Sequence, residues 1–189
     1  MITLFIFTEE PSIKEVLDVV IPKISPDLNF QIFPHQGKND LENALRKTVP
    51  NISKIPNARI IIVRDQDDLD CKELKKSLIS IIENNIYCPY KVRIVCKELE
   101  SWFLGDLSAL EKTFPRFKSA RIATKREMRN VDDIQKPSKY ILKVIPEYAN
   151  KNYLPKINTA KIIAPNLSID NNNSLSFKNM VNAIRKLNG

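Results

Sequence analysis

Apolar residues follow two alternating periods along the first hundred positions of the chain. Short apolar, β-branched runs are typical of strands buried on both faces, and they occupy 2–8, 28–33, 59–63 and 91–96. Apolar residues at helical spacing fill the segments between these runs, at 12–24, 39–48 and 70–86. This β-α-β-α-β-α-β order predicts an α/β fold with a doubly wound, mostly parallel sheet, helices on both faces and right-handed crossovers.

The pattern becomes mainly helical after the fourth run. Three further helices are expected, and they span Glu98–Leu110, 137–145 and 175–187. In the first of them, Trp102 and Phe103 belong to an apolar stripe, so we interpret both as core residues rather than as platforms for nucleic-acid bases. The AKIIA segment at 160–164, which ends at Pro165, is a candidate strand.

Length and composition favour one globular domain. A chain of 189 residues can bury a full hydrophobic core, and we predict a single domain over 1–189 with an α/β core at 1–106 and a C-terminal extension at 107–189. No apolar run approaches the roughly 20 residues that cross a bilayer, so the sequence indicates no membrane protein. The apolar N-terminal run lacks the features of a signal peptide, and three cysteines without CxxC spacing indicate neither disulfides nor a zinc site. We therefore expect a cytoplasmic protein.

The formal net charge of +8 is unevenly distributed. Cations are dense within one stretch of the C-terminal half, at Arg116, Lys118, Arg121, Lys125, Arg126 and Arg129. Such a stretch is typical of a surface that meets phosphates, and Arg121, Lys125 and Arg126 are candidate nucleic-acid contacts. The alternative is an ordinary solvated surface whose lysines reflect a biased genome.

Carboxylates follow three of the four predicted strands. Those closest to the strand ends are Glu9, Glu10, Asp65, Asp67, Glu98 and Glu100. In an open parallel sheet, ligands bind outside the carboxyl ends of the strands, so these groups would share one edge. Their mutual repulsion calls for a cation, and hard oxygen ligands without His or Cys suit Mg²⁺ or Mn²⁺. Asp65 and Asp67 would point the same way if their segment is extended.

An alternative explains such acidic residues as helix caps, which complement the helix dipole, and we expect Asp68 and Asp70 to act in that way. Glu98 and Glu100 would point about 200° apart on a helix, so one ion is not easily shared between them, and we favour Glu100.

The second predicted strand brings another group of residues to the same edge. His35, the only histidine, is either structural or a general acid/base. Gly37 and Lys38 suit a turn that presents a backbone N–H and an ammonium group to a phosphate. With only three glycines, the chain has neither a dinucleotide-binding loop nor a P-loop, and no serine elbow or Cys–His pairing indicates acyl transfer.

An ordered set of motifs resembles a known family. The motifs are EEPS at 9–12, PHQGKNDLE at 34–42, RDQDDLDC at 64–71, KELESWFLGD at 97–106, IAPNL at 163–167 and SF at 176–177. Together they resemble an uncharacterised TOPRIM-like bacterial family that is often encoded beside AAA-type ATPases and is suspected in anti-phage defence. More broadly, a strand that ends in Glu, a later strand that ends in DxD and a doubly wound sheet resemble the TOPRIM domain of topoisomerases, primases and OLD-type nucleases. The similarity spans nearly the whole chain.

This resemblance implies a Mg²⁺- or Mn²⁺-dependent nuclease or phosphodiester-processing enzyme. It implies that Glu9 or Glu10, the pair Asp65 and Asp67, and Glu98 or Glu100 hold metal, and that the late lysine of OLD-type nucleases is matched by Lys156. The implied catalytic residues are Glu9, Asp65, Asp67 and Lys156. One departure is that Glu10 and Pro11 follow Glu9, where many TOPRIM proteins have glycine. The alternative function is a non-catalytic, nucleic-acid- or nucleotide-binding partner of an ATPase.

Overall fold

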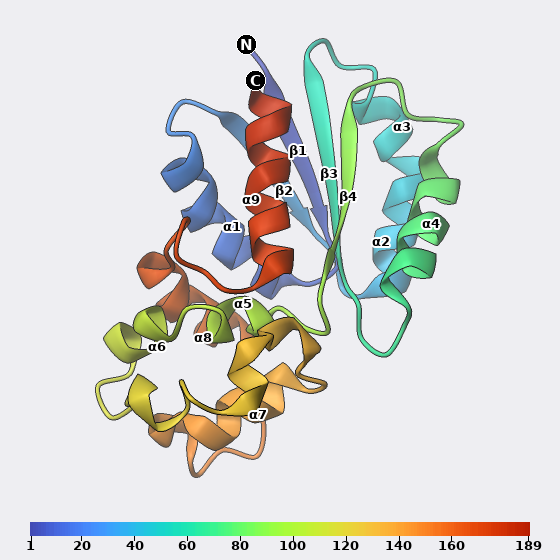
Figure 1. The fold of residues 1–189 in the computed structure, drawn as a ribbon. Coiled ribbons are helices and arrows are strands. Elements are labelled where there is room, and N and C mark those ends of the chain that lie inside the picture. Colours follow the sequence, from blue (N-terminus) through green and yellow to red (C-terminus); the bar gives the residue numbers. More distant parts are fainter.

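A four-stranded parallel sheet forms the centre of the computed structural model, which describes residues 1–189 (Figure 1). The strand order is β2-β1-β3-β4. The strands are β1 (Thr3–Thr8), β2 (Asn29–Pro34), β3 (Ala58–Asp65) and β4 (Tyr90–Val95). The chain therefore steps from β1 outward to β2 and then returns past β1 to β3. The two central strands run side by side over their length, from Thr3 opposite Ala58 to Thr8 opposite Val63.

Alternating side chains of the central strands contribute to two separate hydrophobic cores, one on each face of the sheet. Leu4 and Ile6 of β1 belong to one core, whereas Phe5 and Phe7 belong to the other, as the two-residue period of a strand requires. Helices α1 (Pro11–Ile24) and α9 (Leu175–Asn188) cover the first face. The second face is covered by α2 (Lys38–Lys47), α3 (Val49–Ile52) and α4 (Cys71–Ile82). The predicted doubly wound α/β architecture is confirmed.

A helical lobe lies below the carboxyl ends of the strands (Figure 1). It contains the α-helices α5 (Glu100–Leu104), α6 (Leu107–Thr113), α7 (Pro137–Val144) and α8 (Lys156–Ile163). Its 3-10 turns are η1 (Ser119–Arg121), η2 (Arg126–Arg129), η3 (Val131–Asp133), η4 (Pro146–Tyr148) and η5 (Ala164–Asn166). Buried side chains of α6, α7 and α8 belong to the same 37-residue cluster as those of α1 and α9, so the lobe and the sheet share one core.

The helix expected from Glu98 to Leu110 is divided in two. α5 ends at Gly105, and the Asp106 side chain begins α6 by accepting a hydrogen bond from the backbone N–H of Ala109 (2.9 Å). A Cβ atom at Gly105 would lie 2.1 Å from Oδ1 of Asn172, so only glycine allows this close approach. Trp102 and Phe103 are fully buried, which confirms their assignment to the core.

The candidate strand at 160–164 is wrong, because these residues lie mostly in α8 and end in η5. Ala160 and Ile163 are buried three residues apart, which is helical spacing, and packing of this face against α1 determines the conformation despite the β-branched residues. The helices expected at 137–145 and 175–187 are confirmed as α7 and α9. Cys71, Cys88 and Cys96 are all unpaired. None of the helices combines the length and apolar character that crossing a membrane requires.

Candidate metal centre

The strand order places the carboxyl ends of β1 and β3 side by side at the switch point of the sheet, which we call the crevice. The connection after β1 leads to α1 on one face and the connection after β3 leads to α4 on the other, and ligands of doubly wound sheets bind at such a point. β1 leads directly into Glu9 and Glu10, while β3 ends at Asp65. Glu100 begins α5 shortly after β4. The fold therefore brings carboxylates from three connections to one place, as the sequence predicts.

Asp65 is buried without a full set of hydrogen-bond partners. Its residue is 3% exposed, and Oδ1 has no partner. Burial raises the pKa of its carboxyl well above the usual range. The charges of Glu10 and Glu100 raise this pKa further, while the Lys156 ammonium group opposes them. Oδ1 of this carboxylate therefore lacks both solvent and donors.

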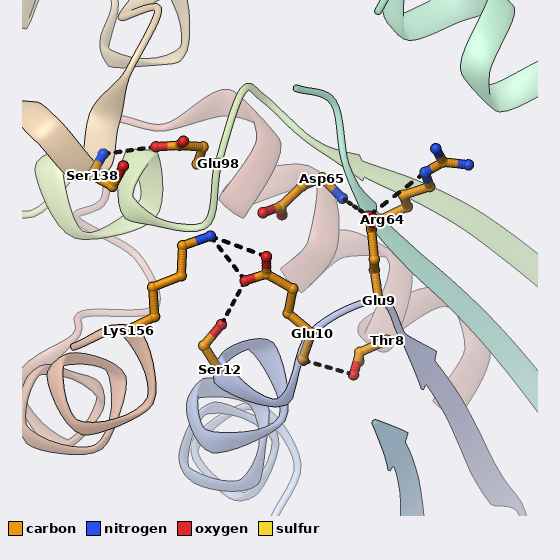
Figure 2. Close-up of polar contacts among 9 residues, drawn as sticks. All are labelled: Thr8, Glu9, Glu10, Ser12, Arg64, Asp65, Glu98, Ser138 and Lys156. Atoms are coloured by element: carbon orange, nitrogen blue, oxygen red, sulfur yellow. Dashed lines mark hydrogen bonds and ion pairs between the residues drawn. The ribbon is translucent and has the colours of Figure 1, made fainter. Parts of the chain in front are cut away.

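Glu100 is the second carboxylate of this kind. It is 0% exposed, and neither Oε1 nor Oε2 has a hydrogen-bond partner. Burial raises its pKa to about 7, although Lys156 acts in the opposite direction. Glu98 points elsewhere, because its Oε2 accepts a hydrogen bond from the backbone N–H of Ser138 in the first turn of α7 (2.8 Å; Figure 2). The two glutamates have separate surroundings, and Glu100 is the one buried beside Asp65.

Glu10 and Lys156 form an ion pair within the crevice. Nζ of Lys156 lies 3.0 Å from both carboxylate oxygens of Glu10, and Ser12 donates a further hydrogen bond to Oε2 (Figure 2). Burial alone would lower the pKa of Lys156, but the charges of Glu100 and Glu10 more than offset it and the pKa is raised. Asp65 acts in the same direction. The ammonium group therefore serves as the counter-ion of three carboxylates.

Glu9 points away from this ion pair and toward Arg64. Its Oε2 lies 3.6 Å from Nε of Arg64 and accepts a hydrogen bond from the backbone N–H of Asp65 (3.2 Å; Figure 2). Arg64 in turn pairs with Glu42 of α2 (3.1 Å). Burial raises the pKa of Glu9, while Arg64 lowers it. Of the two glutamates after β1, Glu10 therefore faces Lys156, and Glu9 is held by Arg64.

Asp67 does not lie beside Asp65 in an extended segment. It has φ of 53°, in the left-handed region, and its side chain is exposed, whereas Asp65 is buried. The extended segment expected for the two aspartates is wrong, because the chain leaves the pleated conformation after β3. Burial still raises the pKa of Asp67, with Lys156 lowering it and Glu10 raising it, so Asp67 lies at the rim of the same charge cluster. Of the expected caps, Asp70 does cap α4, whereas Asp68 pairs with Lys136.

The residues after β2 contribute less than expected. His35 is buried, and its Nδ1 lies 3.0 Å from the backbone oxygen of Thr8. The N–H of Gly37 donates to the backbone oxygen of Glu9 (2.9 Å), so it is not available to a phosphate, contrary to the prediction. Gly37 has φ of 97°, which explains the glycine. Lys38 is exposed at the start of α2 and lines a hollow together with Arg64.

Sequence reasoning missed Arg64 as a site residue. The signal was present, because an arginine interrupts the otherwise apolar run of β3 directly before Asp65. Among the predicted nucleic-acid contacts, Arg121 and Lys125 line one hollow in the helical lobe, whereas Arg126 lines another.

The residues of the crevice fit a hard divalent cation. The buried oxygens without partners on Asp65 and Glu100 are ligands of the type that Mg²⁺ and Mn²⁺ prefer. No three acidic, His or Cys side chains are yet gathered round one point in a metal-binding arrangement. The Lys156 ammonium group, paired with Glu10, provides positive charge among them instead. Glu10 could join Asp65 and Glu100 as a ligand of one ion only after its ion pair with Lys156 has separated.

The family model described as "Domain of unknown function (DUF4276)" matches residues 8–185. No curated protein and no solved structure matches the chain. The matched range contains every residue of the crevice, from Glu9 to Lys156. Because the model covers nearly the whole sequence, the chain belongs to the DUF4276 family.

Proposed function

We propose that the protein is a Mg²⁺- or Mn²⁺-dependent phosphodiesterase that acts on nucleic acid. The observation that carries this proposal is the pair of buried carboxylates, Asp65 and Glu100, whose oxygens lack partners at the carboxyl edge of the sheet. Leaving such groups unsatisfied costs about 1–3 kcal/mol each or more. A bound cation would offset this cost, and it would explain why the fold keeps the two carboxylates together.

Glu10, Asp65 and Glu100 would hold the ion, with Glu9, Asp67 and Glu98 around them. A bound Mg²⁺ would supply Lewis-acid polarisation of a phosphoryl oxygen. Arg64 would keep the Glu9 carboxylate oriented through the ion pair at 3.6 Å. Lys156, on separating from Glu10, would place its ammonium group beside the phosphoryl oxygens, where developing negative charge is stabilised.

The resemblance to TOPRIM proteins extends this proposal to the protein's setting. It suggests an AAA-type ATPase as partner and a role in anti-phage defence. We also propose a cytoplasmic location, since three unpaired cysteines suit a reducing compartment.

A second candidate function is a non-catalytic nucleic-acid- or nucleotide-binding partner of an ATPase. It is favoured by the ion pair between Lys156 and Glu10, which already neutralises part of the acidic cluster without a metal. In that case Lys156 would remain a structural counter-ion, and the crevice would bind ligands without cutting them.

Titration calorimetry with Mg²⁺ and Mn²⁺, together with cleavage of end-labelled DNA and RNA, tests the proposal. The variants are Asp65→Asn and Glu100→Gln, and Asp68→Asn is the matched control because it removes one exposed carboxylate from the same loop. We expect the first two to lose metal binding and at least about 100-fold in cleavage, since a catalytic metal contributes several kcal/mol. Asp68→Asn should retain both within about twofold.

Two results would count against the enzyme. If the wild-type protein binds neither ion at millimolar concentration, the metal site does not exist and the proposal is wrong. If the wild type binds metal and nucleic acid but cuts no substrate, the non-catalytic function replaces it.

A further inference from the structure

Most of the net positive charge of the protein lies in the helical lobe. Residues 100–166 contain 13 Lys and Arg against seven Asp and Glu, which leaves +6. The rest of the chain contains 17 Lys and Arg against 15 Asp and Glu, which leaves +2. The lobe therefore carries most of the net charge of the molecule, beside the acidic crevice.

Within the lobe, four cations surround one hollow of about 210 Å³. The cations are Lys118, Arg121, Lys125 and Lys143. The other lining residues are apolar or proline, and two of them, Phe117 and Ile122, are buried and form a firm base. No carboxylate lines this hollow. We call it the Lys118–Lys143 hollow.

None of these four cations has an acidic partner. The ion pairs of the lobe are Lys136 with Asp68, Lys156 with Glu10 and Lys161 with Glu15. Four like charges around one small space repel one another, and an anion would relieve that repulsion. A neighbouring hollow of about 400 Å³ differs, because Glu127 and Asp133 line it together with Arg126 and Arg129. The Lys118–Lys143 hollow therefore combines four cations that have no acidic partner with a lining that has no carboxylate.

Helix α7 links this hollow to the acidic crevice. Its first turn contacts Glu98 through the hydrogen bond from Ser138, and the charge of Glu98 is felt by Asp67 and Glu100. Lys143 lies near the other end of α7. Five residues of helix rise about 7.5 Å, so α7 runs from the neighbourhood of the acidic residues to the hollow. A strand whose phosphodiester lies at the crevice could thus place a nearby phosphate over the hollow.

We propose that the Lys118–Lys143 hollow binds a backbone phosphate of nucleic acid, a few nucleotides from the phosphodiester at the acidic crevice. The choice of substrate class rests on the proposed function. An anionic membrane is a less suitable occupant, since the apolar residues of the hollow form its base and include no exposed large hydrophobic side chain.

Fluorescence anisotropy with labelled 12-nucleotide DNA and RNA, in EDTA and over a range of salt concentrations, tests the proposal without relying on cleavage. The test variant is Arg121→Ala/Lys125→Ala. Its control is Lys47→Ala/Lys72→Ala, which removes the same charge from exposed lysines of α2 and α4. We expect at least tenfold weaker binding for the test variant. The slope of log affinity against log salt should fall by about 0.7–0.9, which is the contribution of the one phosphate contact that the hollow provides. The control should stay within about twofold of wild type.

Equal losses in the two double variants would overturn the proposal, because net charge rather than the hollow would then govern binding. Binding to phosphatidylserine vesicles, but not to oligonucleotides, would overturn it in favour of a membrane surface. The binding measurement does not depend on the proposed chemistry. If the protein binds oligonucleotides through the hollow but cuts none, this inference is supported and the proposed enzyme is wrong. If Arg121→Ala/Lys125→Ala cuts as the wild type does, the proposed enzyme is supported and this inference is wrong.

Discussion

Two buried aspartates, Asp132 in the helical lobe and Asp65 at the end of β3, show opposite ways of placing a carboxylate inside the protein. They are 8% and 3% exposed, respectively. Asp132 accepts hydrogen bonds from Oγ of Ser174 (2.7 Å) and from the backbone N–H of Ser176 (2.8 Å). Oδ1 of Asp65 accepts none. Both carboxylates are buried, but only Asp132 has donors for its oxygens, so Asp65 is the one whose burial calls for a further explanation.

The same contrast separates Asp106 from Glu100. Asp106 begins α6 and accepts hydrogen bonds from the backbone N–H groups of Ala109 (2.9 Å) and Ser168 (2.8 Å), so it joins two segments of the lobe. Glu100 is just as deeply buried but has no donor at either oxygen. Satisfied carboxylates hold the lobe together, and those at the sheet edge remain available to a cation.

The largest expected effect on stability is the loss of a satisfied carboxylate. Asp132→Ala should lower the free energy of unfolding by about 3–4 kcal/mol, because it leaves the buried donors of Ser174 and Ser176 without an acceptor. Asp65→Asn, measured in EDTA, should cause no loss, since the wild-type oxygen has no partner there. Urea denaturation of both variants provides the measurement. Equal destabilisation would remove the distinction between the two aspartates.

A smaller effect should appear in the pH dependence of stability without metal. The pKa of Glu100 is raised by burial from 4.5 to about 7 in the folded protein, so its contribution is complete below pH 4.5 and is lost as pH rises through 7. Asp65 acts in the same direction. In EDTA the free energy of unfolding should fall between pH 4.5 and 7, by up to about 1.4 kcal/mol per pH unit for one proton. Glu100→Gln should flatten the slope, and a slope unchanged in that variant would contradict the prediction.

The smallest effect concerns the counter-ion of the crevice. Lys156→Met removes the charge that competes with a metal for Glu10, so Mn²⁺ affinity should rise about tenfold, or roughly 1.4 kcal/mol. Cleavage should still fall, because no ammonium group remains beside the phosphate. Lys161→Met is the matched control, since Lys161 lies on the same helix and its exposed ammonium group lies 3.8 Å from the carboxylate of Glu15. Calorimetry that finds weaker Mn²⁺ binding in Lys156→Met would show that the lysine supports the site rather than competes for it.

Periodicity predicted the sheet and most of its helices because both faces of the central strands β1 and β3 are buried. A short apolar run such as RIIIV at 59–63 is best interpreted as a strand when segments with helical spacing precede and follow it. The segment at 160–164 was misassigned for the converse reason. Its five residues fit a strand or a helix equally well, and its packing against α1, which no local pattern reports, decided between them.

The strand-end rule likewise predicted where the carboxylates gather, but not the direction of each side chain. Glu9 and Glu10 are adjacent and chemically equivalent in sequence, and only the positions of Arg64 and Lys156 distinguish them. The left-handed backbone of Asp67 is also set by its surroundings, since its N–H donates to the backbone oxygen of Lys97, another residue with positive φ. Such hydrogen bonds between distant loops produce no periodic pattern in the sequence.

The connection between Gly105 and Asn172–Asn173 closes the helical lobe at its base. The N–H of Asn173 donates to the backbone oxygen of Gly105 (2.8 Å), and Nδ2 of Asn172 donates to that of Trp102 (2.8 Å). The lobe is thus an excursion whose two ends are fastened together. Since the entropy of closing such an excursion grows only with the logarithm of its length, insertions into the exposed turns of the lobe would cost little closure entropy. Insertions into α8 would not be tolerated in the same way, because its buried residues belong to the core that the lobe shares with the sheet.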